Sequence, residues 1–253
     1  MSARPLLVAG GRGPSLLDRL DPRTRVLAAA AFALAVVLAG GLAAPAGAVA
    51  VAVVLAGLAR LDARRTLGRM LALEGFMLLA LALLPFTTPG VPVAEFAGLP
   101  VTAEGLRRAA AIMLKANAVV LATLALAGAM EVVDLGHALA RLGAPQRFVV
   151  LFLFTVRYIE VLDREYRRLR LAMRARAFRM RAGLHCWRSI GMLFGMLMVT
   201  SAERAERIHA AMRLRGFDGR FHIADDRRPG PLDWGFGAAH CLALLALAAV
   251  DLA

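Results

Sequence analysis

The chain has 253 residues, of which 60% are hydrophobic, and it carries a formal net charge of +13; its mean hydropathy is +0.66. Soluble domains contain roughly 45–50% apolar residues, so this composition excludes an ordinary soluble domain and favours a membrane protein, for which lipid is the solvent of the surplus apolar surface. Lys115 is the only lysine. Arginine supplies the remaining basic charge, and its planar guanidinium suits anionic lipid headgroups, nucleic acid or acidic grooves on a partner protein.

A helix start precedes the first apolar run. In Leu20-Asp21-Pro22-Arg23-Thr24, the Asp21 side chain can cap a helix, and Pro22 suits the first helical position because its missing N–H would have no partner there. The sequence before Val26 is polar and contains five arginines. We therefore interpret the run that follows as a membrane span rather than as part of a signal peptide.

Two short apolar runs come next, Val26–Leu42 and Ala46–Ala59. At about 1.5 Å per residue, each is short for a hydrocarbon core of roughly 30 Å. We predict a helical hairpin with a tight turn at Pro45, which interrupts the apolar sequence. One long span is the alternative, which Pro45 and Gly40-Gly41 make less favourable.

Three later apolar runs are predicted to span the membrane: Met70–Phe86, Ala109–Met130 and Trp234–Leu252. The segment Thr87–Ala103 contains three prolines and no basic residue. We predict that it is a loop.

Basic residues are unevenly distributed among the connecting segments. The N-terminus has five arginines, Arg60–Arg69 has four and Glu131–Leu232 has nineteen, whereas the turn at Pro45 and the loop Thr87–Ala103 have none. Because basic segments remain in the cytoplasm, this pattern predicts five spans, with the N-terminus inside and the C-terminus outside. The expected location is the cell inner (plasma) membrane.

The predicted fold is an all-α integral membrane protein with about five transmembrane helices and long cytoplasmic amphipathic helices. We divide it into a membrane domain of four helices at residues 1–130, a cytoplasmic region at 131–232 and a C-terminal transmembrane helix at 233–253.

Two long helices are predicted in the cytoplasmic region. The stretch Pro145–Phe178 contains no glycine and no further proline, and a second helical stretch runs from about Leu184 to Leu214. Each has an apolar part too short to span a membrane and a charged part. This pattern predicts amphipathic helices at or under the bilayer, packed on each other.

A heptapeptide sequence occurs twice, as Ala172-Met173-Arg174-Ala175-Arg176-Ala177-Phe178 and Ala211-Met212-Arg213-Leu214-Arg215-Gly216-Phe217. Each copy ends a predicted helix, where the helix dipole favours a cation, and Gly216 suits a helix C-cap. Two interpretations remain open. The copies are either ordinary arginine-rich helix ends, or two equivalent plugs for acidic sockets on a two-fold symmetric partner, anchored by Phe178 and Phe217.

With these features, the chain resembles the transmembrane T component, or scaffold, of energy-coupling factor (ECF) ABC transporters, in the cobalt-transport branch of the CbiQ type. The resemblance covers nearly the whole chain, from the Leu20–Thr24 start to the two arginine signatures. The family signature is roughly Ala-Arg-Gly, present twice. Here the triplets are Ala175-Arg176-Ala177 and Leu214-Arg215-Gly216, each with one departure, and Met212–Arg220 is similar to the cobalt branch in particular.

The resemblance implies that separate subunits carry out the separate steps of transport. Two ABC ATPase subunits would bind ATP and Mg and hydrolyse the ATP, and a separate cobalt-binding membrane subunit would capture the substrate. A small accessory membrane subunit is a further candidate partner. This chain would link them in the lipid bilayer, and would itself bind no cofactor and no nucleic acid. The residues that would couple it to the ATPases are Ala175, Arg176, Ala177, Phe178, Leu214, Arg215, Gly216 and Phe217.

The sequence offers no pattern typical of catalysis or of a metal site. Gly10-Gly11-Arg12-Gly13 has no lysine and follows no apolar strand, so it lacks the features of a phosphate-binding loop. His185-Cys186 are adjacent and point to different faces of a helix, and Cys186 and Cys241 are far apart in the chain. We predict a non-catalytic transporter subunit with no metal site of its own.

Three polar residues lie inside predicted spans: Glu74, Lys115 and Asn117. Intramembrane polar residues are candidate functional sites, so contact with the substrate-capturing subunit is one interpretation. Packing toward neighbouring helices, or snorkelling to the membrane surface, is the other.

Alternative functions remain to be weighed. Import of nickel instead of cobalt would use the same scaffold role. In a different class, a membrane-bound enzyme of lipid metabolism could hold anionic headgroups with its arginines, but the sequence shows no catalytic acid, base or metal cluster for it. A nucleic-acid-binding protein would need basic and aromatic residues interleaved on one face, whereas the aromatic residues here lie in apolar runs.

Overall fold

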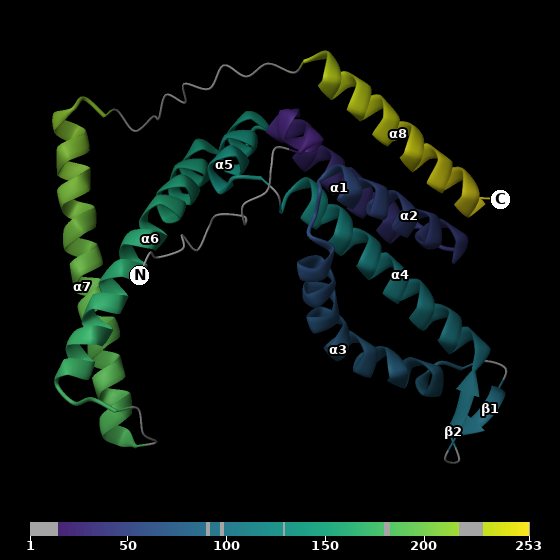
Figure 1. Ribbon diagram of the computed structural model, residues 1–253, viewed down its shortest axis with the longest axis horizontal. Coiled ribbons are helices and arrows are strands. Elements are labelled where there is room, and N and C mark those ends of the chain that lie inside the picture. The colour runs from purple at the N-terminus through teal and green to yellow at the C-terminus, as the bar shows by residue number, and fades with distance from the viewer. Residues whose placement is uncertain are drawn as a thin grey trace. The chain divides into compact units, whose positions relative to one another are not determined.

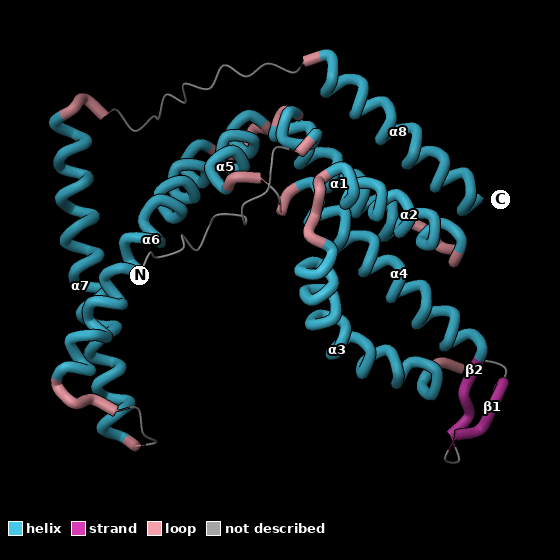
Figure 2. The backbone as a smooth tube through the Cα atoms, in the orientation of Figure 1, coloured by secondary structure: helices cyan, strands magenta, loops and turns pink. Residues whose placement is uncertain are grey.

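The computed structural model describes residues 15–89, 92–96, 99–128, 130–179, 183–217 and 230–252. These residues are mostly helical, which confirms the predicted all-α fold class (Figure 1, Figure 2). They divide into two compact units. The core unit consists of the described residues within Ala9–Ala138 and Asp226–Ala253, and the paired-helix unit of those within Leu139–Asp225.

The secondary structure of the core unit is η1 (Leu16–Arg19), α1 (Pro22–Leu38), α2 (Ala43–Leu58), α3 (Ala63–Thr87), β1 (Pro92–Phe96), β2 (Leu99–Thr102), α4 (Ala103–Leu126) and α8 (Pro231–Leu252). The short helix α5 (Val132–Arg141), which was not predicted, begins in this unit and ends in the next. The paired-helix unit contains α6 (Gln146–Ala175) and α7 (Leu184–Leu214). Both long helices expected between residues 145 and 214 are therefore confirmed as helices, and their cytoplasmic location stays a prediction.

The helix α1 starts as predicted. Asp21 is its N-cap, and Oδ1 of Asp21 accepts the N–H of Arg23 at 2.9 Å, while Pro22 occupies the first helical position. This arrangement uses only neighbouring residues, because a side chain one position before a helix reaches its first free N–H groups.

The predicted turn at Pro45 is wrong. The helical hairpin exists, but its break lies between α1 and α2 at Ala39–Leu42, where Gly40 and Gly41 are located. Pro45 is the third residue of α2. A proline is tolerated there because the N–H groups of the first helical turn have no intrahelical partner to lose.

Two of the described helices are long and apolar enough to cross a membrane, α4 and most of α8. The helices α1 and α2 have 17 and 16 residues, which is about 25 Å at 1.5 Å per residue. The helix α3 has 25 residues, but charged residues interrupt it, among them Arg64 and Glu74. The total of five spans therefore stays a prediction.

The segment Thr87–Ala103, predicted to be a loop, contains a β-hairpin. β1 and β2 pair antiparallel, with Phe96 opposite Leu99 and Pro92 opposite Thr102 (Figure 2). In a two-stranded sheet each strand is an edge strand, so a proline can direct its missing N–H away from the partner strand. The prolines that favoured a loop are for this reason compatible with strands.

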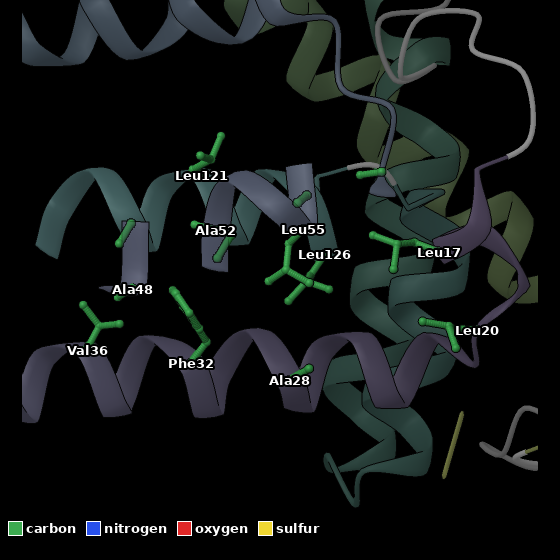
Figure 3. Packing of buried hydrophobic residues seen from close by; sticks show 14 residues of the cluster. Leu17, Leu20, Ala28, Phe32, Val36, Ala48, Ala52, Leu55, Leu121 and Leu126 are labelled. Carbon is green, nitrogen blue, oxygen red and sulfur yellow. The ribbon is translucent and has the colours of Figure 1, made fainter. Parts of the chain in front are cut away.

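The core lies between α1, α2 and α4. Figure 3 shows Phe32 and Val36 of α1 facing small side chains of α2. Because lipid is as apolar as a protein core, helices in a membrane associate through close packing, which small residues permit. The buried alanines of this core are Ala28, Ala48, Ala52, Ala59, Ala118, Ala122 and Ala125.

A buried arginine joins the start of α1 to the end of α4. Arg25 is 3% exposed; its Nε donates to the carbonyl oxygen of Leu126 at 2.9 Å, and its Nη1 lies 3.4 Å from Oδ1 of Asp18. Burial by itself would raise the pKa of Asp18, but the N–H of Ser15 and the charge of Arg25 outweigh it, so that this pKa lies below its ordinary value. A cation at the C-terminal end of α4 is also favoured by the helix dipole.

Polar side chains hold α8 against α1. The N–H of Asp21 donates to Oδ1 of Asp233 at 2.7 Å, and Nε2 of His240 lies 3.0 Å from the carbonyl oxygen of Ala28. The His240 ring also stacks against Phe236, with ring centroids 5.8 Å apart. The two contacts with α1 were not predicted, because they join residues more than 200 positions apart in the chain.

At its other end, α8 binds the turn between α1 and α2. The carboxylate of Asp251 accepts the N–H of Gly40 at 2.9 Å and that of Gly41 at 2.8 Å. The glycines leave these N–H groups accessible, since a Cβ at Gly41 would lie 3.2 Å from the Asp251 carboxylate.

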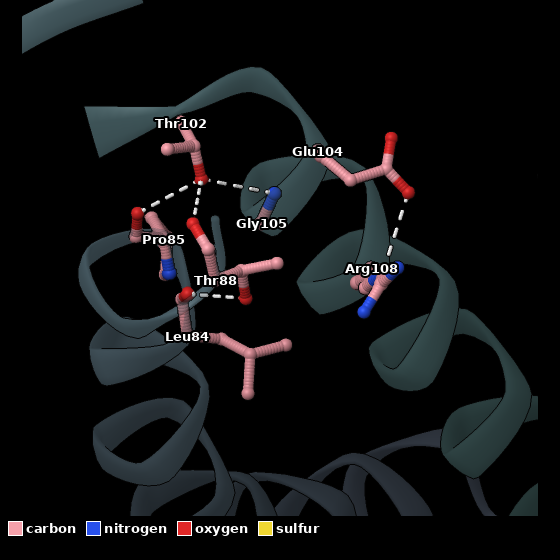
Figure 4. Close-up of polar contacts among 7 residues, drawn as sticks. All are labelled: Leu84, Pro85, Thr88, Thr102, Glu104, Gly105 and Arg108. Atoms are coloured by element: carbon pink, nitrogen blue, oxygen red, sulfur yellow. Dashed lines mark hydrogen bonds and ion pairs between the residues drawn. The ribbon is translucent and has the colours of Figure 1, made fainter. Parts of the chain in front are cut away.

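A hydroxyl group joins the end of α3 to the start of α4 (Figure 4). Oγ1 of Thr102 lies 3.1 Å from the carbonyl oxygen of Pro85 and 3.0 Å from that of Thr88, and it accepts the N–H of Gly105 at 3.3 Å. The backbones are close here, because a Cβ at Gly105 would lie 2.6 Å from Cα of Pro85.

We expect Gly105→Ala to separate α3 from α4, because the added methyl group would meet backbone atoms of Leu84 and Pro85 that cannot move aside alone. Such overpacking costs about 1–3 kcal/mol, and thermal unfolding in detergent should show a lower unfolding temperature. Gly237→Ala is the control, since a Cβ there meets no described atom within 4 Å and alanine favours a helix. Equal unfolding temperatures for the two variants would contradict the close approach.

Candidate functional site

The first copy of the repeated sequence forms a helix-terminating structure at the end of α6. The N–H of Phe178 donates to the carbonyl oxygen of Met173 at 3.1 Å, and the N–H of Ala177 donates to that of Arg174 at 3.0 Å. This pair of bonds is the Schellman motif, which satisfies carbonyl groups that a helix end leaves without partners.

The second copy forms the same structure at the end of α7. The N–H of Phe217 donates to the carbonyl oxygen of Met212 at 3.0 Å, and the N–H of Gly216 donates to that of Arg213, also at 3.0 Å. The expectation that each copy ends a helix is thus confirmed. The two copies are equivalent in backbone hydrogen bonding as well as in sequence.

The Schellman motif explains why methionine and phenylalanine recur together. A hydrophobic contact between these two positions of the motif often accompanies its hydrogen bonds. Met173 and Phe178 line one groove between α6 and α7, and Met212 and Phe217 line another. The recurring apolar residues therefore close the helix ends.

The residue after each C-cap adopts a left-handed conformation. Ala177 has φ +61° and Gly216 has φ +79°. Glycine adopts this conformation without a steric penalty, whereas an L-residue with a Cβ is strained by about 1–2 kcal/mol. The two helix ends thus differ at the residue after the C-cap, where the second end has Gly216 and the first has Ala177.

The signature arginines are the C-cap residues and are exposed. Arg176 follows α6 and Arg215 follows α7. Neither forms an ion pair with any residue that the structure describes, whereas Arg167 within α6 pairs with Asp163 at 2.8 Å. Both guanidinium groups are therefore exposed and unpaired within the part of the chain that the structure describes.

The helices α6 and α7 run antiparallel to each other. One groove between them, of about 690 Å³, is lined by Val150 near the start of α6 and by Met212 near the end of α7. A second groove is lined by Met173 near the end of α6 and His185 at the start of α7. The two signature ends are therefore at opposite ends of the pair, separated by about 45 Å for helices of 30 and 31 residues.

The paired-helix unit exposes much apolar surface. No described residue of α7 is buried, and Leu214, beside the second signature arginine, is 91% exposed. Apolar surface of this extent on a folded unit marks a contact with another protein or with lipid. Large exposed apolar side chains of α6 and α7 include Phe148, Leu151, Leu171, Leu184, Trp187, Met192, Met198 and Leu214.

Comparison with known families identifies the chain. The family model of CbiQ, a cobalt transport protein, matches residues 13–223. The chain belongs to the CbiQ family. No curated protein matches it. The matched residues include α1 to α7 and both signature ends, whereas α8 lies beyond them.

Membership in the CbiQ family confirms the resemblance stated from the sequence. This CbiQ-family chain is a membrane component of cobalt transport, and its family implies a transporter with further components. The residues that the structure describes hold no group of three or more His, Cys, Asp or Glu side chains arranged to bind a metal ion.

Two of the three polar residues predicted to lie inside membrane spans make contacts inside the chain. Nζ of Lys115 donates to the carbonyl oxygens of Val37, at 3.2 Å, and of Ala39, at the C-terminal end of α1. Nδ2 of Asn117 donates to the carbonyl oxygen of Met113 in its own helix at 3.1 Å. These bonds favour the packing interpretation, and contact with a second subunit stays a prediction.

The third of these residues, Glu74, lies in α3, and its side chain is outside the part of the chain that the structure describes.

The strain at Ala177 predicts opposite effects of two substitutions. Ala177→Gly should relieve the left-handed strain and stabilise the end of α6 by about 0.5–1 kcal/mol, and Gly216→Ala should destabilise the end of α7 by a similar amount. Hydrogen exchange of the Phe178 and Phe217 amides, which close the two motifs, reports the change: slower for Phe178 in the first variant and faster for Phe217 in the second. Unchanged exchange in both would contradict the assigned conformation.

Proposed function

We propose that this chain is the scaffold subunit of an ECF-type ABC importer for cobalt ions. It links two ABC ATPase subunits to a separate membrane subunit that captures the substrate. The observation that carries the proposal is the pair of helix ends that share one pattern of backbone hydrogen bonds. Each presents an exposed C-cap arginine, Arg176 or Arg215, that is without an ion pair among the described residues.

The antiparallel arrangement supports a partner with two equivalent subunits. Residues 146–175 of α6 and residues 185–214 of α7 are separated by the same number of positions as the two signatures, so the two helices are equivalent along almost their whole length. Two helices of nearly equal length, antiparallel and with the same ends, are related by an approximate two-fold axis. A dimer of ATPases has such an axis too, and would present one socket to each end.

Each socket would combine acidic and apolar chemistry. Arginine pairs with a carboxylate through two parallel hydrogen bonds, which fixes orientation as well as supplying energy. Phe178 and Phe217 lie next to the signature residues, and a half-buried aromatic ring is a frequent anchor at the centre of an interface. The Schellman motif holds arginine and ring in one geometry, which reduces the entropy lost on binding.

The length of the helices suggests how ATP hydrolysis reaches the membrane. The helix α6 has 30 residues without glycine or an internal proline, so it transmits displacement of its end as a rigid rod. Closure of the ATPases would bring their sockets together, tilt α6 and α7, and reorient the substrate-capturing subunit. In this arrangement the N-terminus and the signature ends are cytoplasmic, the C-terminus is outside, and the membrane is the cell inner membrane.

Ion selection belongs to the substrate-capturing subunit in this proposal. Uptake of radiolabelled cobalt and nickel by the assembled complex distinguishes the two ions, and preferred uptake of nickel would change the substrate while leaving the scaffold role in place.

We expect Arg176→Glu and Arg215→Glu each to weaken capture of the ATPases at least tenfold, because a carboxylate would face an acidic socket and lose the bidentate bonds. The measurement is the amount of ATPase that co-purifies with the chain from membranes in mild detergent.

Arg157→Glu is the matched control. Arg157 is also an exposed arginine of α6, but it lies in the middle of the helix, and its variant should retain the ATPases. Normal co-purification by both signature variants would refute the docking role, and a wild-type chain that purifies without ATPases would refute the scaffold role altogether and favour an enzyme acting on lipids.

A further inference from the structure

One groove between α6 and α7 is lined mostly by apolar side chains. It has a volume of about 690 Å³, and its lining includes Val150 and Phe154 of α6 with Ile208 and Met212 of α7. Among the described residues that line it there is no aspartate or glutamate, and Arg204 is the one arginine. Ligand sites in proteins share this composition, an apolar concave surface with a few polar groups that orient the ligand.

Arg204 is a cation without a partner in this groove. It is half-buried, and it forms no ion pair or hydrogen bond with any residue that the structure describes. Arg207, less than one turn further along α7, is exposed, and its Nη1 lies 3.7 Å from Oε2 of Glu203. A guanidinium that loses part of its water against apolar side chains is stabilised by an anion that it can bind through two parallel hydrogen bonds. The lining therefore leaves one positive charge for a ligand to compensate.

A tyrosine supplies a second polar group to the same groove. Tyr158 of α6 lines it and is half-buried, and its ring is stacked on that of Phe154, with ring centroids 5.8 Å apart. Because the helices run antiparallel, the lining of α6 from Val150 onward faces that of α7 from Met212 backward, which puts Tyr158 at about the level of Arg204. Tyrosine combines an apolar ring with a hydroxyl donor, so it suits a ligand that is apolar at one end and polar at the other.

The groove differs in polarity along its length. Arg204 and Met212 are separated by about 12 Å along α7. On this side of Arg204 the lining includes Ile208, Met212 and Val150, together with His209, which is exposed. A ligand that matches both parts carries a negative charge at one end and a hydrocarbon chain at the other.

An anionic phospholipid has both kinds of group, because its phosphate is joined to long hydrocarbon chains. The helices α6 and α7 carry eleven arginines and five acidic residues, an excess of positive charge that attracts an anionic membrane surface. The chain belongs to a family of membrane components, so phospholipid is an abundant amphiphile in its surroundings. Charge and composition therefore favour a lipid as the occupant.

We propose that this groove binds an anionic phospholipid: the phosphate group accepts hydrogen bonds from Arg204 and Tyr158, and one acyl chain lies between α6 and α7 in the direction of Met212. A guanidinium suits a phosphate because two of its N–H groups match two phosphate oxygens. The inference does not depend on the scaffold role, because it concerns a ligand of this chain alone.

The test is lipid binding by the full-length chain, purified in mild detergent and stripped of lipid. Dioleoyl phosphatidylglycerol is anionic, and dioleoyl phosphatidylcholine is zwitterionic with the same acyl chains. Each is titrated separately, and native mass spectrometry measures the fraction of chain that carries lipid. We expect phosphatidylglycerol to bind about tenfold more tightly, because no cation in its own headgroup competes for the phosphate.

We expect Arg204→Gln to weaken binding of phosphatidylglycerol about fivefold and to change binding of phosphatidylcholine little, since the variant loses one positive charge and keeps the apolar groove. Arg207→Gln is the matched control. It is the same substitution on the same helix, at an exposed arginine that pairs with Glu203 and does not line the groove, and its affinity should stay within about twofold of wild type.

Ala205→Phe tests the acyl-chain site without changing charge. Ala205 lines the groove and is exposed, so the added ring takes the space of the acyl chain without disturbing a buried residue. Binding of both lipids should fall about fivefold, because less apolar surface remains for the chain to cover. Ala202→Phe is its control, at an exposed position of α7 that does not line the groove, and it should bind both lipids like wild type.

A phosphatidylglycerol with a photoreactive diazirine at the end of one acyl chain locates the site, and we expect crosslinks to Val150 or Met212. Several outcomes would overturn the proposal: equal affinity of the wild-type chain for the two lipids, an equal loss in Arg204→Gln and Arg207→Gln, or crosslinks confined to residues outside the groove. Unchanged lipid binding in both Arg204→Gln and Ala205→Phe would also overturn it, and if Ala205→Phe then lost a co-purifying subunit, the groove would be a site for protein instead.

Discussion

The core unit depends on side chains that satisfy the backbone at helix ends. A helix leaves its first N–H and last C=O groups without partners, and in apolar surroundings an unpaired group costs several kcal/mol. Here partners come from remote parts of the chain: Arg25 for the carbonyl of Leu126 at the end of α4, and Asp251 for the N–H groups of Gly40 and Gly41 in the turn between α1 and α2. Each such bond also connects two helices, so the requirement for pairing determines which helix ends meet.

The paired-helix unit satisfies its helix ends in a different way. At the ends of α6 and α7, each of the two Schellman bonds closes within the last turn, between residues three or five positions apart. No side chain is used, and the arginine at each C-cap remains exposed. The same physical requirement therefore immobilises polar side chains in the core unit and leaves them available for a partner in the paired-helix unit.

This contrast agrees with a chain that must be both rigid and adaptable. Small side chains bring α1, α2 and α4 close together, and polar contacts keep α8 in register with α1. In the paired-helix unit, grooves and exposed apolar residues lie along the whole length of α6 and α7. A surface of that kind contacts another protein or lipid, and the chain's family implies a transporter with further components.

The sequence by itself determined whatever depends on neighbouring residues. The Asp21 cap, the limits of α7 and the two equivalent helix ends all follow from interactions within about five positions, so their signals are contiguous in the chain. Only the tertiary structure decided the break at Gly40-Gly41, the pairing of the β-hairpin, the partners of Lys115 and the register of α8. Apart from the hairpin, these features depend on contacts between residues 76 to 212 positions apart in the chain. The sequence shows that a polar group needs a hydrogen-bond partner, but it does not show which distant group will be that partner.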